Sequence, residues 1–256
     1  MLATLDLNAD LGEGTGEAGA RLDGALLDIV TSANVACGGH AGDDASMRRV
    51  CAGAAARGVA VGAQVSYADR EGFGRRRLEV PEPVLAGQLL EQMLALAAAA
   101  ESTGSAVAYL KPHGALYHAA ADDPPVARAV VDAVSRFGVA LPVLTRPGSE
   151  LSLAAQSVGL TVYAEAFADR GYGPDGRLVS RDAPGALLVD EAEVRARLHR
   201  LVRDGEIVAV DGSIHAARVD SVCVHSDTPG AVALARSARE ALESLGVRVA
   251  PFAGRL

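Results

Sequence analysis

The chain of 256 residues is long enough for one large hydrophobic core or for two small domains, and its hydrophobic fraction of 50% is typical of a globular protein. A formal net charge of -8, without a basic stripe that carries interleaved aromatic residues, argues against a nucleic-acid partner. The chain does not open on a signal segment, and its most apolar window, 94–100, is too short to cross a bilayer, so we expect no membrane partner. The three cysteines form no C-x-x-C pair, and their odd number predicts free thiols in a reducing cytoplasm.

Strand-like apolar runs alternate with helical segments along the whole chain. The strands are predicted at residues 2–9, 31–37, 59–63, 106–111, 139–144, 160–167 and 220–225. The helices are predicted at residues 23–30, 43–57, 83–102, 123–137, 148–157, 188–203 and 229–246. Segment 170–182, with a turn at 174–176, and segment 206–219 are expected to be excursions from this pattern. Regular strand-then-helix alternation predicts a parallel sheet, and without any linker we expect one domain over residues 1–256.

Reactive polar side chains follow six of the seven predicted strands. They are Asp10 and Glu13, His40 and Asp43, Gln64 and Asp69, Lys111 and His113, Glu165 with Asp169 and Arg170, and His225 with Asp227. An open parallel sheet gathers ligands at one switch point between two strands, whereas a barrel collects residues from many strand ends on one face. This distribution favours a closed seven-stranded parallel β/α barrel.

The stretch LDLNADLGEGTGEAG, residues 5–19, admits two interpretations. Its glycines fit the G-x-G-x-x-G spacing of a dinucleotide-binding turn, but Asp10 and Glu13 at the mouth of that turn would repel a pyrophosphate. No acidic residue ends the second predicted strand to bind a ribose. We therefore favour an acidic catalytic strand end over a phosphate cradle.

Three polar residues share one face of the first predicted strand. Asp6, Asn8 and Asp10 alternate with apolar residues that face the other way. Buried carboxylates are costly unless they are paired, so this face predicts a functional lining. For Asp6 and Asn8 a structural role, tying neighbouring loops together, is an equal alternative.

Six segments of the chain resemble motifs of the LamB/YcsF family, which comprises bacterial 5-oxoprolinase A subunits. The segments are DLNADLGEG at 6–14, SANVACGGHAGD at 32–43, GFGRR at 72–76, KPHGALY at 111–117, EAFADRGYGPDGRLVSR at 165–181 and VCVHSDTPGA at 222–231. They run nearly end to end in the expected order. The resemblance implies a barrel related to glycoside hydrolases and deacetylases. It also implies a subunit that opens 5-oxo-L-proline to L-glutamate with ATP hydrolysis, alongside two other subunits.

The resemblance, together with the polar strand ends, implies a set of site residues. The expected catalytic residues are Asp10, His40, Lys111, His113 and Glu165, and the expected substrate-binding residues are Asn8, Glu13, Asp43, Asp169, Arg170, His225 and Asp227. Coupling to ATP most simply means phosphorylating the lactam oxygen before water adds to the activated carbon. Lys111 suits the developing oxyanion, while His40 or His113 suits the base. Asp10 or Glu165 suits the positioning of water.

Several of these residues have structural alternatives. Asp169 and Arg170 could form a local ion pair, Asp227 could be a helix N-cap, and His225 could belong to the core. Cys37 could be a nucleophile, but a buried inert thiol is the commoner outcome. The histidines at other positions, His118, His199 and His215, are expected to be structural.

The cofactor expected from the resemblance is ATP, with Mg²⁺ as a candidate metal. In deacetylase-like relatives an aspartate and two histidines hold a divalent metal, and the matching positions here are Asp10, His40 and Gln64. Glutamine binds zinc far more weakly than imidazole does, so a tight zinc site is not expected, whereas Mg²⁺ could bind carboxylates such as Asp10. Because the chain has no G-x-x-x-x-G-K-[ST] loop, ATP would bind by another arrangement or on a partner subunit. Two alternatives stay open, an autonomous metal-dependent deacetylase-like hydrolase and a non-catalytic partner subunit.

Overall fold

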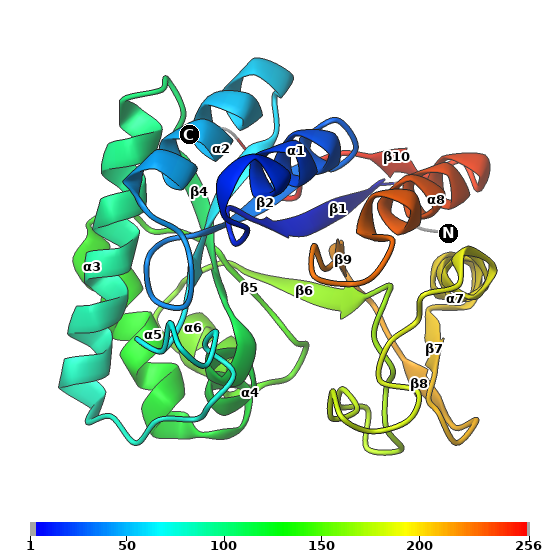
Figure 1. Cartoon of the computed structure of the whole chain (residues 1–256). Helices are drawn as coiled ribbons and strands as arrows, with labels where there is room; N and C mark the ends of the chain where they lie inside the picture. The colour runs from blue at the N-terminus through cyan, green and yellow to red at the C-terminus, as the bar shows by residue number, and fades with distance from the viewer. Residues whose placement is uncertain (1–3, 255–256) are drawn as a thin grey trace.

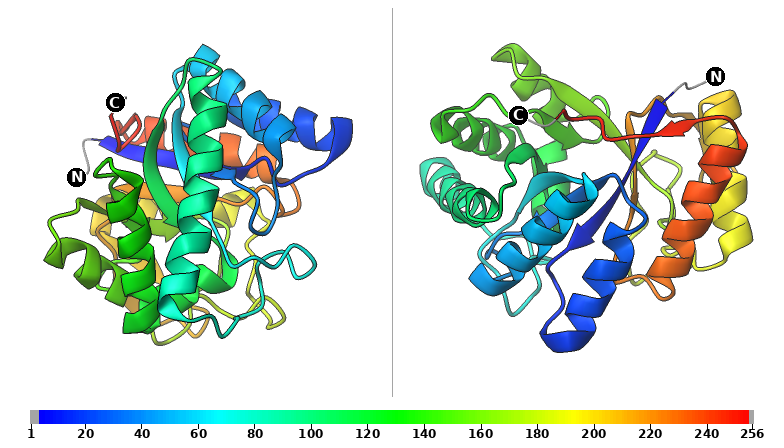
Figure 2. Two further views of the ribbon diagram at one scale, coloured as in Figure 1. Left: turned by 90° about the vertical axis from the view of Figure 1, so that its left-hand side faces the viewer. Right: turned by 90° about the horizontal axis from the view of Figure 1, so that it is seen from above.

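Strand β1 (Thr4–Leu11) has a parallel neighbour on each side in the computed structural model, which describes residues 4–254 (Figure 1). The other barrel strands are β2 (Ser32–Ala36), β3 (Ala60–Val65), β4 (Val107–Pro112), β5 (Val143–Thr145), β6 (Val162–Phe167) and β9 (Ser221–Val224). They pair in the order β1-β2-β3-β4-β5-β6-β9, and β9 pairs with β1 to close the ring. The prediction of a closed seven-stranded parallel barrel is therefore confirmed. Strand β10 (Arg248–Val249) lies beside the start of β1 (Figure 2).

Helices cover the outside of the barrel (Figure 2). They are α1 (Gly16–Leu27), α2 (Asp44–Arg57), α3 (Glu82–Glu101), α4 (Gly114–Asp122), α5 (Pro124–Phe137), α6 (Glu150–Ser157), α7 (Glu191–Asp204) and α8 (Ala231–Ser244). Except for α1 and α4, each begins and ends within three residues of its predicted range.

The prediction of a helix at 23–30 was wrong, because α1 begins at Gly16 and ends at Leu27. Three glycines lower the helix propensity of this stretch, but tertiary packing overrides that preference. A Cβ atom on Gly19 would lie 2.5 Å from the carbonyl carbon of Gly14, so the two backbones pack directly on each other. The glycine spacing therefore serves the contact between the strand-end turn and α1. Helix α4 was missed because its start coincides with the polar end of β4.

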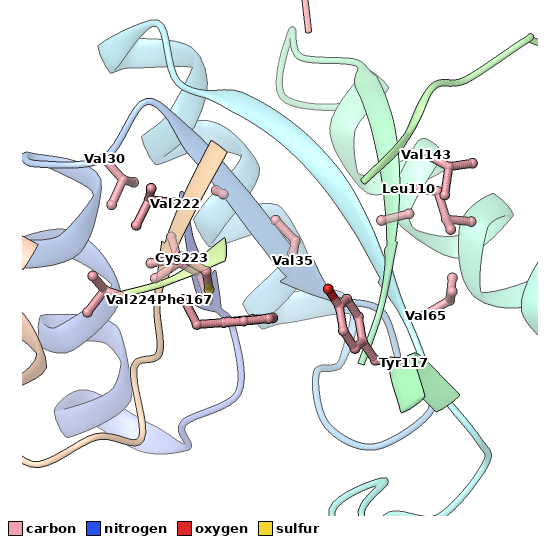
Figure 3. Packing of buried hydrophobic residues seen from close by; sticks show 14 of the residues in the cluster. Val30, Val35, Val65, Leu110, Tyr117, Val143, Phe167, Val222, Cys223 and Val224 are labelled. Atoms are coloured by element: carbon pink, nitrogen blue, oxygen red, sulfur yellow. The ribbon is translucent and has the colours of Figure 1, made fainter. Parts of the chain in front are cut away.

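The two faces of the barrel strands have different environments. The outward face packs on the helices through apolar side chains, and Figure 3 shows examples from five strands. These are Val35, Val65, Leu110, Val143, Val222 and Val224. The inner face holds a small apolar cluster that includes Tyr109 and Leu144, against which Phe252 packs. Toward the carboxyl ends of the strands the inner face becomes polar.

Three irregular segments lie at one end of the barrel, in the lower part of Figure 1. They are loop 66–81 between β3 and α3, segment 168–190 between β6 and α7, and the antiparallel hairpin of β7 (Glu206–Val208) and β8 (Ile214–Ala216). Segment 168–190 contains the excursion that was expected at 170–182. The hairpin lies within the excursion that was expected at 206–219. Loop 66–81 and segment 168–190 follow strand carboxyl ends directly, so they surround the polar end of the interior.

By length and composition, α3 is the one helix within residues 4–254 that could span a membrane. It contacts α2 and α5 on the outside of the barrel. Its side chains Leu85, Leu89, Met93 and Leu96 are buried. The apolar window at 94–100 lies within this helix.

Candidate active site

Lys111, at the end of β4, is the centre of a buried polar cluster inside the barrel. Its Nζ lies 2.6 Å from Glu165 Oε1 and 3.6 Å from Asp10 Oδ1, and it donates a hydrogen bond to Asn8 Oδ1 at 3.2 Å. Burial would lower the pKa of Lys111, but Cys223, Glu165 and Asp10 hold it well above its ordinary value. Burial also raises the pKa of the Cys223 thiol, so the thiol keeps its proton and carries no charge. The negative charge that stabilises the Lys111 ammonium therefore comes from Glu165 and Asp10. Lys111 is therefore a fixed ammonium between two acids.

The carboxylates beside Lys111 differ in their pKa shifts. Burial would raise the pKa of Asp10, but Lys111, His225 and His113 hold it well below the usual range. Asn34 Nδ2 adds a hydrogen bond to Asp10 Oδ1 at 2.8 Å. Burial raises the pKa of Glu165, against the opposing effect of Lys111. Asp10 is thus the more firmly ionised of the two acids.

Glu13 lies in the turn after β1 and connects this cluster to two histidines. Its Oε1 is 3.0 Å from His40 Nε2 and 3.4 Å from His113 Nδ1, and it accepts a hydrogen bond from Gln64 Nε2 at 3.1 Å. Ser226 Oγ donates to Oε2 at 3.3 Å. Burial raises the pKa of Glu13 to about 7, and the charge of Asp10 acts in the same direction. Glu13 can therefore exchange a proton near neutral pH.

The rings of His40 and His113 stack with centroids 3.7 Å apart and an interplanar angle of 8°. His113 Nε2 lies 3.1 Å from the carbonyl oxygen of Phe73 and must donate to it, so Nδ1 accepts the hydrogen bond from Gln64 Nε2 at 3.0 Å. Burial lowers the pKa of each histidine to about 4. Both are therefore neutral at pH 7 and are weaker bases than Glu13.

The trio expected for a metal was Asp10, His40 and Gln64, but the geometry brings a different trio together. Ligand atoms of Glu13, His40 and His113 lie within 4.8 Å of one another. Gln64 turns its amide nitrogen toward Glu13 and His113, and its Oε1 is buried without a hydrogen-bond partner. Two neutral imidazoles and a carboxylate fit a single divalent cation, and Gln64 Oε1 would face such an ion if the amide were turned over.

Asp169 and Arg170, which follow β6, bind different partners and form no ion pair with each other within residues 4–254. Asp169 accepts hydrogen bonds from the backbone and Nδ1 of His225, at 3.1 and 2.9 Å, and from Thr228. Despite burial, the charge of His225 and these bonds lower the pKa of Asp169 to about 2. Arg170 instead binds Asp227 at 3.1 Å. The local ion-pair alternative is thus wrong.

Asp227, after β9, is held by three arginines. Its carboxylate lies 2.6 Å from Arg75 Nη2, 2.7 Å from Arg181 Nη1 and 3.1 Å from Arg170 Nη2. The N-cap of α8 is Gly230, so the N-cap alternative for Asp227 is also wrong. Sequence reasoning missed Arg75 and Arg181, although both lie in the motifs GFGRR and 165–181.

Two predicted residues have roles outside this cluster. The Asp43 carboxylate caps α2 in a reciprocal capping box with Ser46, which corrects its assignment to substrate binding. The Cys37 thiol is buried, its pKa is raised by that burial, and its Sγ lies 3.2 Å from the Gln64 carbonyl oxygen. A thiol in this environment is inert, as the commoner alternative predicted.

A cavity of about 260 Å³ lies between α4, β6 and the β7–β8 hairpin. Its lining includes Tyr117, His118, Asp122, Arg146, Glu165, Phe167, Tyr172, Arg177 and His215. The Tyr117 hydroxyl and Glu165 Oε2 are both buried, and neither has a hydrogen-bond partner in the described part of the chain. His118 and His215, which were expected to be structural, thus belong to the cavity wall. Tyr117 was missed, although it ends the motif KPHGALY.

Comparison with known proteins places the chain among relatives of nearly equal length. The LamB/YcsF family model matches residues 5–256. The chain is 53% identical to the 5-oxoprolinase A subunit of Streptomyces coelicolor over 97% of this chain and 100% of that protein. It is 40% identical to the crystal structure of a lactam utilization protein from Thermus thermophilus, with a TM-score of 0.88 over 97% of this chain and all of that one.

A more distant match supports the barrel alone. The catalytic domain of a peptidoglycan N-acetylglucosamine deacetylase from Eubacterium rectale is 12% identical, with a TM-score of 0.51 over 98% of this chain and 88% of that one. This likeness concerns the fold alone. The near full-length match to the family model and the 53% identity to a curated relative establish that the chain belongs to the LamB/YcsF family.

Proposed function

We propose that this chain is a subunit of an ATP-dependent 5-oxoprolinase and opens 5-oxo-L-proline to L-glutamate at the carboxyl end of its barrel. The similarity to 5-oxoprolinase A subunits supports the assignment to this enzyme. The proposal includes ATP and Mg²⁺, because hydrolysis of a stabilised five-membered amide must be coupled to hydrolysis of ATP. It also includes two other subunits. A cytoplasmic location is part of it too, in keeping with three free cysteines.

The observation that carries the catalytic role is that two residues lining the cavity, Tyr117 and Glu165, each have a buried polar atom without a hydrogen-bond partner within residues 4–254. A lactam ring holds its N–H and C=O on the same side, so it presents one donor and one acceptor together. The Tyr117 hydroxyl can donate to the carbonyl, and Glu165 Oε2 can accept from the N–H. Buried polar groups without partners are costly, so a ligand that pairs with both gains affinity.

The same cavity has a site for the carboxylate of the substrate. Arg146 and Arg177 both bind Asp122, at 2.8 and 2.9 Å. Arg177 also lies 3.7 Å from Asp175, so two carboxylates face the two guanidinium groups. The carboxylate of 5-oxoproline can bind here by replacing one of these aspartates on its arginine.

The buried cluster can supply the chemistry of ring opening. Lys111, charged and 2.6 Å from Glu165, can stabilise negative charge that develops at the lactam oxygen. Glu13 replaces the two histidines as our proposed base for water, because a pKa of about 7 is better matched to neutral pH than a pKa of about 4. Asp10, 3.6 Å from Lys111 Nζ, then helps to keep Lys111 charged.

The first experiment is a glutamate-release assay with 5-oxo-L-proline, with and without ATP and Mg²⁺. The protein is tested alone and then with the two proposed partner subunits. We expect release that requires ATP and the partners. No release under any combination would overturn the proposed function.

Two tyrosine variants test the cavity within that assay. Tyr117→Phe removes the unpaired hydroxyl and should lower kcat/KM about tenfold, the usual effect of losing one hydrogen bond to a substrate. Tyr163→Phe is the matched control, because Tyr163 packs on Phe252 in the apolar cluster inside the barrel. Equal activity of the two variants would exclude the cavity as the lactam site.

A second candidate function is a metal-dependent hydrolase, favoured by the trio Glu13, His40 and His113. A bound divalent cation would polarise a carbonyl group in such an enzyme. Metal analysis of the purified protein and acetate release from acetylated sugars test it. Stoichiometric metal with acetate release, and no glutamate release, would favour this candidate over the lactamase.

A further inference from the structure

The three arginines around Asp227 come from separate parts of the chain. Arg75 lies in loop 66–81, while Arg170 and Arg181 lie in segment 168–190. Their side chains converge on one carboxylate at distances of 2.6, 3.1 and 2.7 Å. Like charges repel, so three guanidinium groups gather at one point only if counter-charge balances them.

The counter-charge that the structure provides is too small. Asp227 is the one carboxylate within residues 4–254 that pairs with these arginines. Asp169 lies near Arg170, but its oxygens are taken by His225 and Thr228. Glu13, the other acid near Arg75, pairs with His40 and His113 and forms no ion pair with the three arginines within residues 4–254. The cluster therefore carries an excess of positive charge.

The cluster also has an unused donor. Arg170 is 4% exposed, and its Nη1 is buried without any hydrogen-bond partner among residues 4–254. Arg75 and Arg181 have side chains that are 44% and 40% exposed, so the cluster is open to solvent on one side. A buried guanidinium with a free N–H group, flanked by two accessible ones, is the arrangement that binds an oxyanion.

The arginine cluster adjoins the buried catalytic cluster. Arg75 directly follows Phe73 and Gly74, which pack against the stacked pair His40 and His113. Ser226, next to Asp227 in the chain, donates a hydrogen bond to Glu13 at 3.3 Å. An anion held by the three arginines would therefore lie beside the proposed base.

We propose that Arg75, Arg170 and Arg181 bind a phosphoryl group, and that the Asp227 carboxylate holds the three arginines in place until the phosphoryl oxygens replace it. The choice of a phosphoryl group over a carboxylate rests on charge. Three guanidinium groups around one carboxylate leave two positive charges in excess, which matches a phosphate dianion better than a monoanionic carboxylate. This inference rests on the proposed function, in which the phosphoryl group is carried by a phosphorylated lactam, by released orthophosphate or by ATP.

The test is calorimetric titration of the full chain with orthophosphate, with acetate as the carboxylate control. We expect orthophosphate to bind at least tenfold more tightly than acetate. Arg181→Gln should weaken orthophosphate binding about tenfold, and the matched control Arg195→Gln should leave it unchanged. Arg195 is also 41% exposed and ion-paired, but its partner is Glu240 on the outer helix α8.

Asp227→Asn gives a change of opposite sign. The variant removes the competing carboxylate, so orthophosphate should bind several-fold more tightly, a result that a purely structural role of Asp227 does not predict. Phosphate that binds no more tightly than acetate, or an Arg181→Gln variant with unchanged affinity, would overturn the proposal.

Further titrations identify the source of the phosphoryl group. If ATP binds to the chain alone and displaces orthophosphate, the nucleotide occupies the site. If only orthophosphate binds, the ligand is the phosphorylated lactam or its product. These experiments distinguish a failure of the arginine site from a failure of the proposed function. Glutamate release without phosphate binding would reject only the arginine site. Phosphate binding that Arg181→Gln abolishes, without glutamate release, rejects only the 5-oxoprolinase assignment.

Discussion

Among Glu13, His40 and His113, Glu13 has the pKa nearest to neutral pH. Asp10 titrates well below the usual range, His40 and His113 titrate near pH 4, and Lys111 stays charged. A group that works as an acid or base at neutral pH needs a pKa near 7. Burial, together with the charges of Asp10 and Asp227, raises the pKa of Glu13 to about 7.

Replacing Glu13 by glutamine keeps the size of the side chain and removes its titration. We expect Glu13→Gln to lower kcat by about 10² to 10³-fold, the usual contribution of a general base. Since a base acts in its ionised form, wild-type kcat/KM should rise with pH through about 7, and the variant should lose this rise. A pH profile of glutamate release in the complete mixture of subunits measures both. A wild-type profile that falls through pH 7 would make Glu13 the acid instead.

At the scale of elements, loop 66–81 positions the stacked histidines. Phe73 and Gly74 both have positive φ, 55° and 65°. The Phe73 carbonyl accepts a hydrogen bond from His113, and the Gly74 carbonyl accepts one from the backbone of Ala115 at 2.9 Å, at the start of α4. The loop thereby joins the end of β3 to α4 and covers one side of the histidine pair.

Gly74→Ala tests this role of the loop. A Cβ atom would lie 2.8 Å from His40 Cβ and 3.1 Å from His113 Cδ2, so the rings must shift. Positive φ adds a strain of about 1–2 kcal/mol for alanine. Gly104→Ala is the matched control, because its φ is 72° and nothing lies within 4 Å of the added Cβ.

We expect both variants to lose similar unfolding free energy from strain, with an additional loss in Gly74→Ala from the clash. Only Gly74→Ala should lose activity, by at least about tenfold in kcat/KM, because displaced catalytic groups are poorly oriented. Thermal unfolding and glutamate release measure the two effects. Equal activity of the two variants would show that the loop does not position the histidines.

At the scale of the whole molecule, Asp6 joins the strands where the barrel closes. Its Oδ1 accepts hydrogen bonds of 2.6 Å from Thr31 and from Ser32 of β2, and its Oδ2 accepts one from Ser221 of β9. Burial raises the pKa of Asp6 to about 6, although the three hydroxyl groups act to lower it. Asp6 thus has the structural role that was one of its two alternatives, because its side chain ties neighbouring segments together.

The raised pKa of Asp6 predicts a pH dependence of stability. Between pH 3.8 and about 6 the folded protein keeps a proton on Asp6 that the unfolded chain has lost, so the free energy of unfolding falls as pH rises. The full difference corresponds to about 3 kcal/mol. Asp6→Asn should remove this component while its amide keeps the bonds to the hydroxyl groups.

Urea unfolding at several pH values between about 4 and 7 measures this slope. Asp132→Asn, an exposed and ion-paired site on α5, is the control and should keep the wild-type slope. A slope that persists in Asp6→Asn would place the proton on another group.

The sequence by itself determined the barrel and the chemical character of its polar end. Alternation of apolar and polar residues put Asn8 and Asp10 on the inner face of β1, and polar strand ends from six strands indicated one shared site. These features follow from local periodicity and from the parallel direction of the strands. For the same reason most helices were predicted to within three residues.

The tertiary structure alone decided which polar residues act on one another. Glu13 acquires its pKa from groups on several strand ends, Asp43 caps a helix instead of joining the site, and Arg75 and Arg181 converge on Asp227 from distant segments. Ion pairs and pKa shifts depend on contacts of a few ångströms between side chains of different elements. Local sequence preferences do not encode those distances, so only the closed barrel determines them.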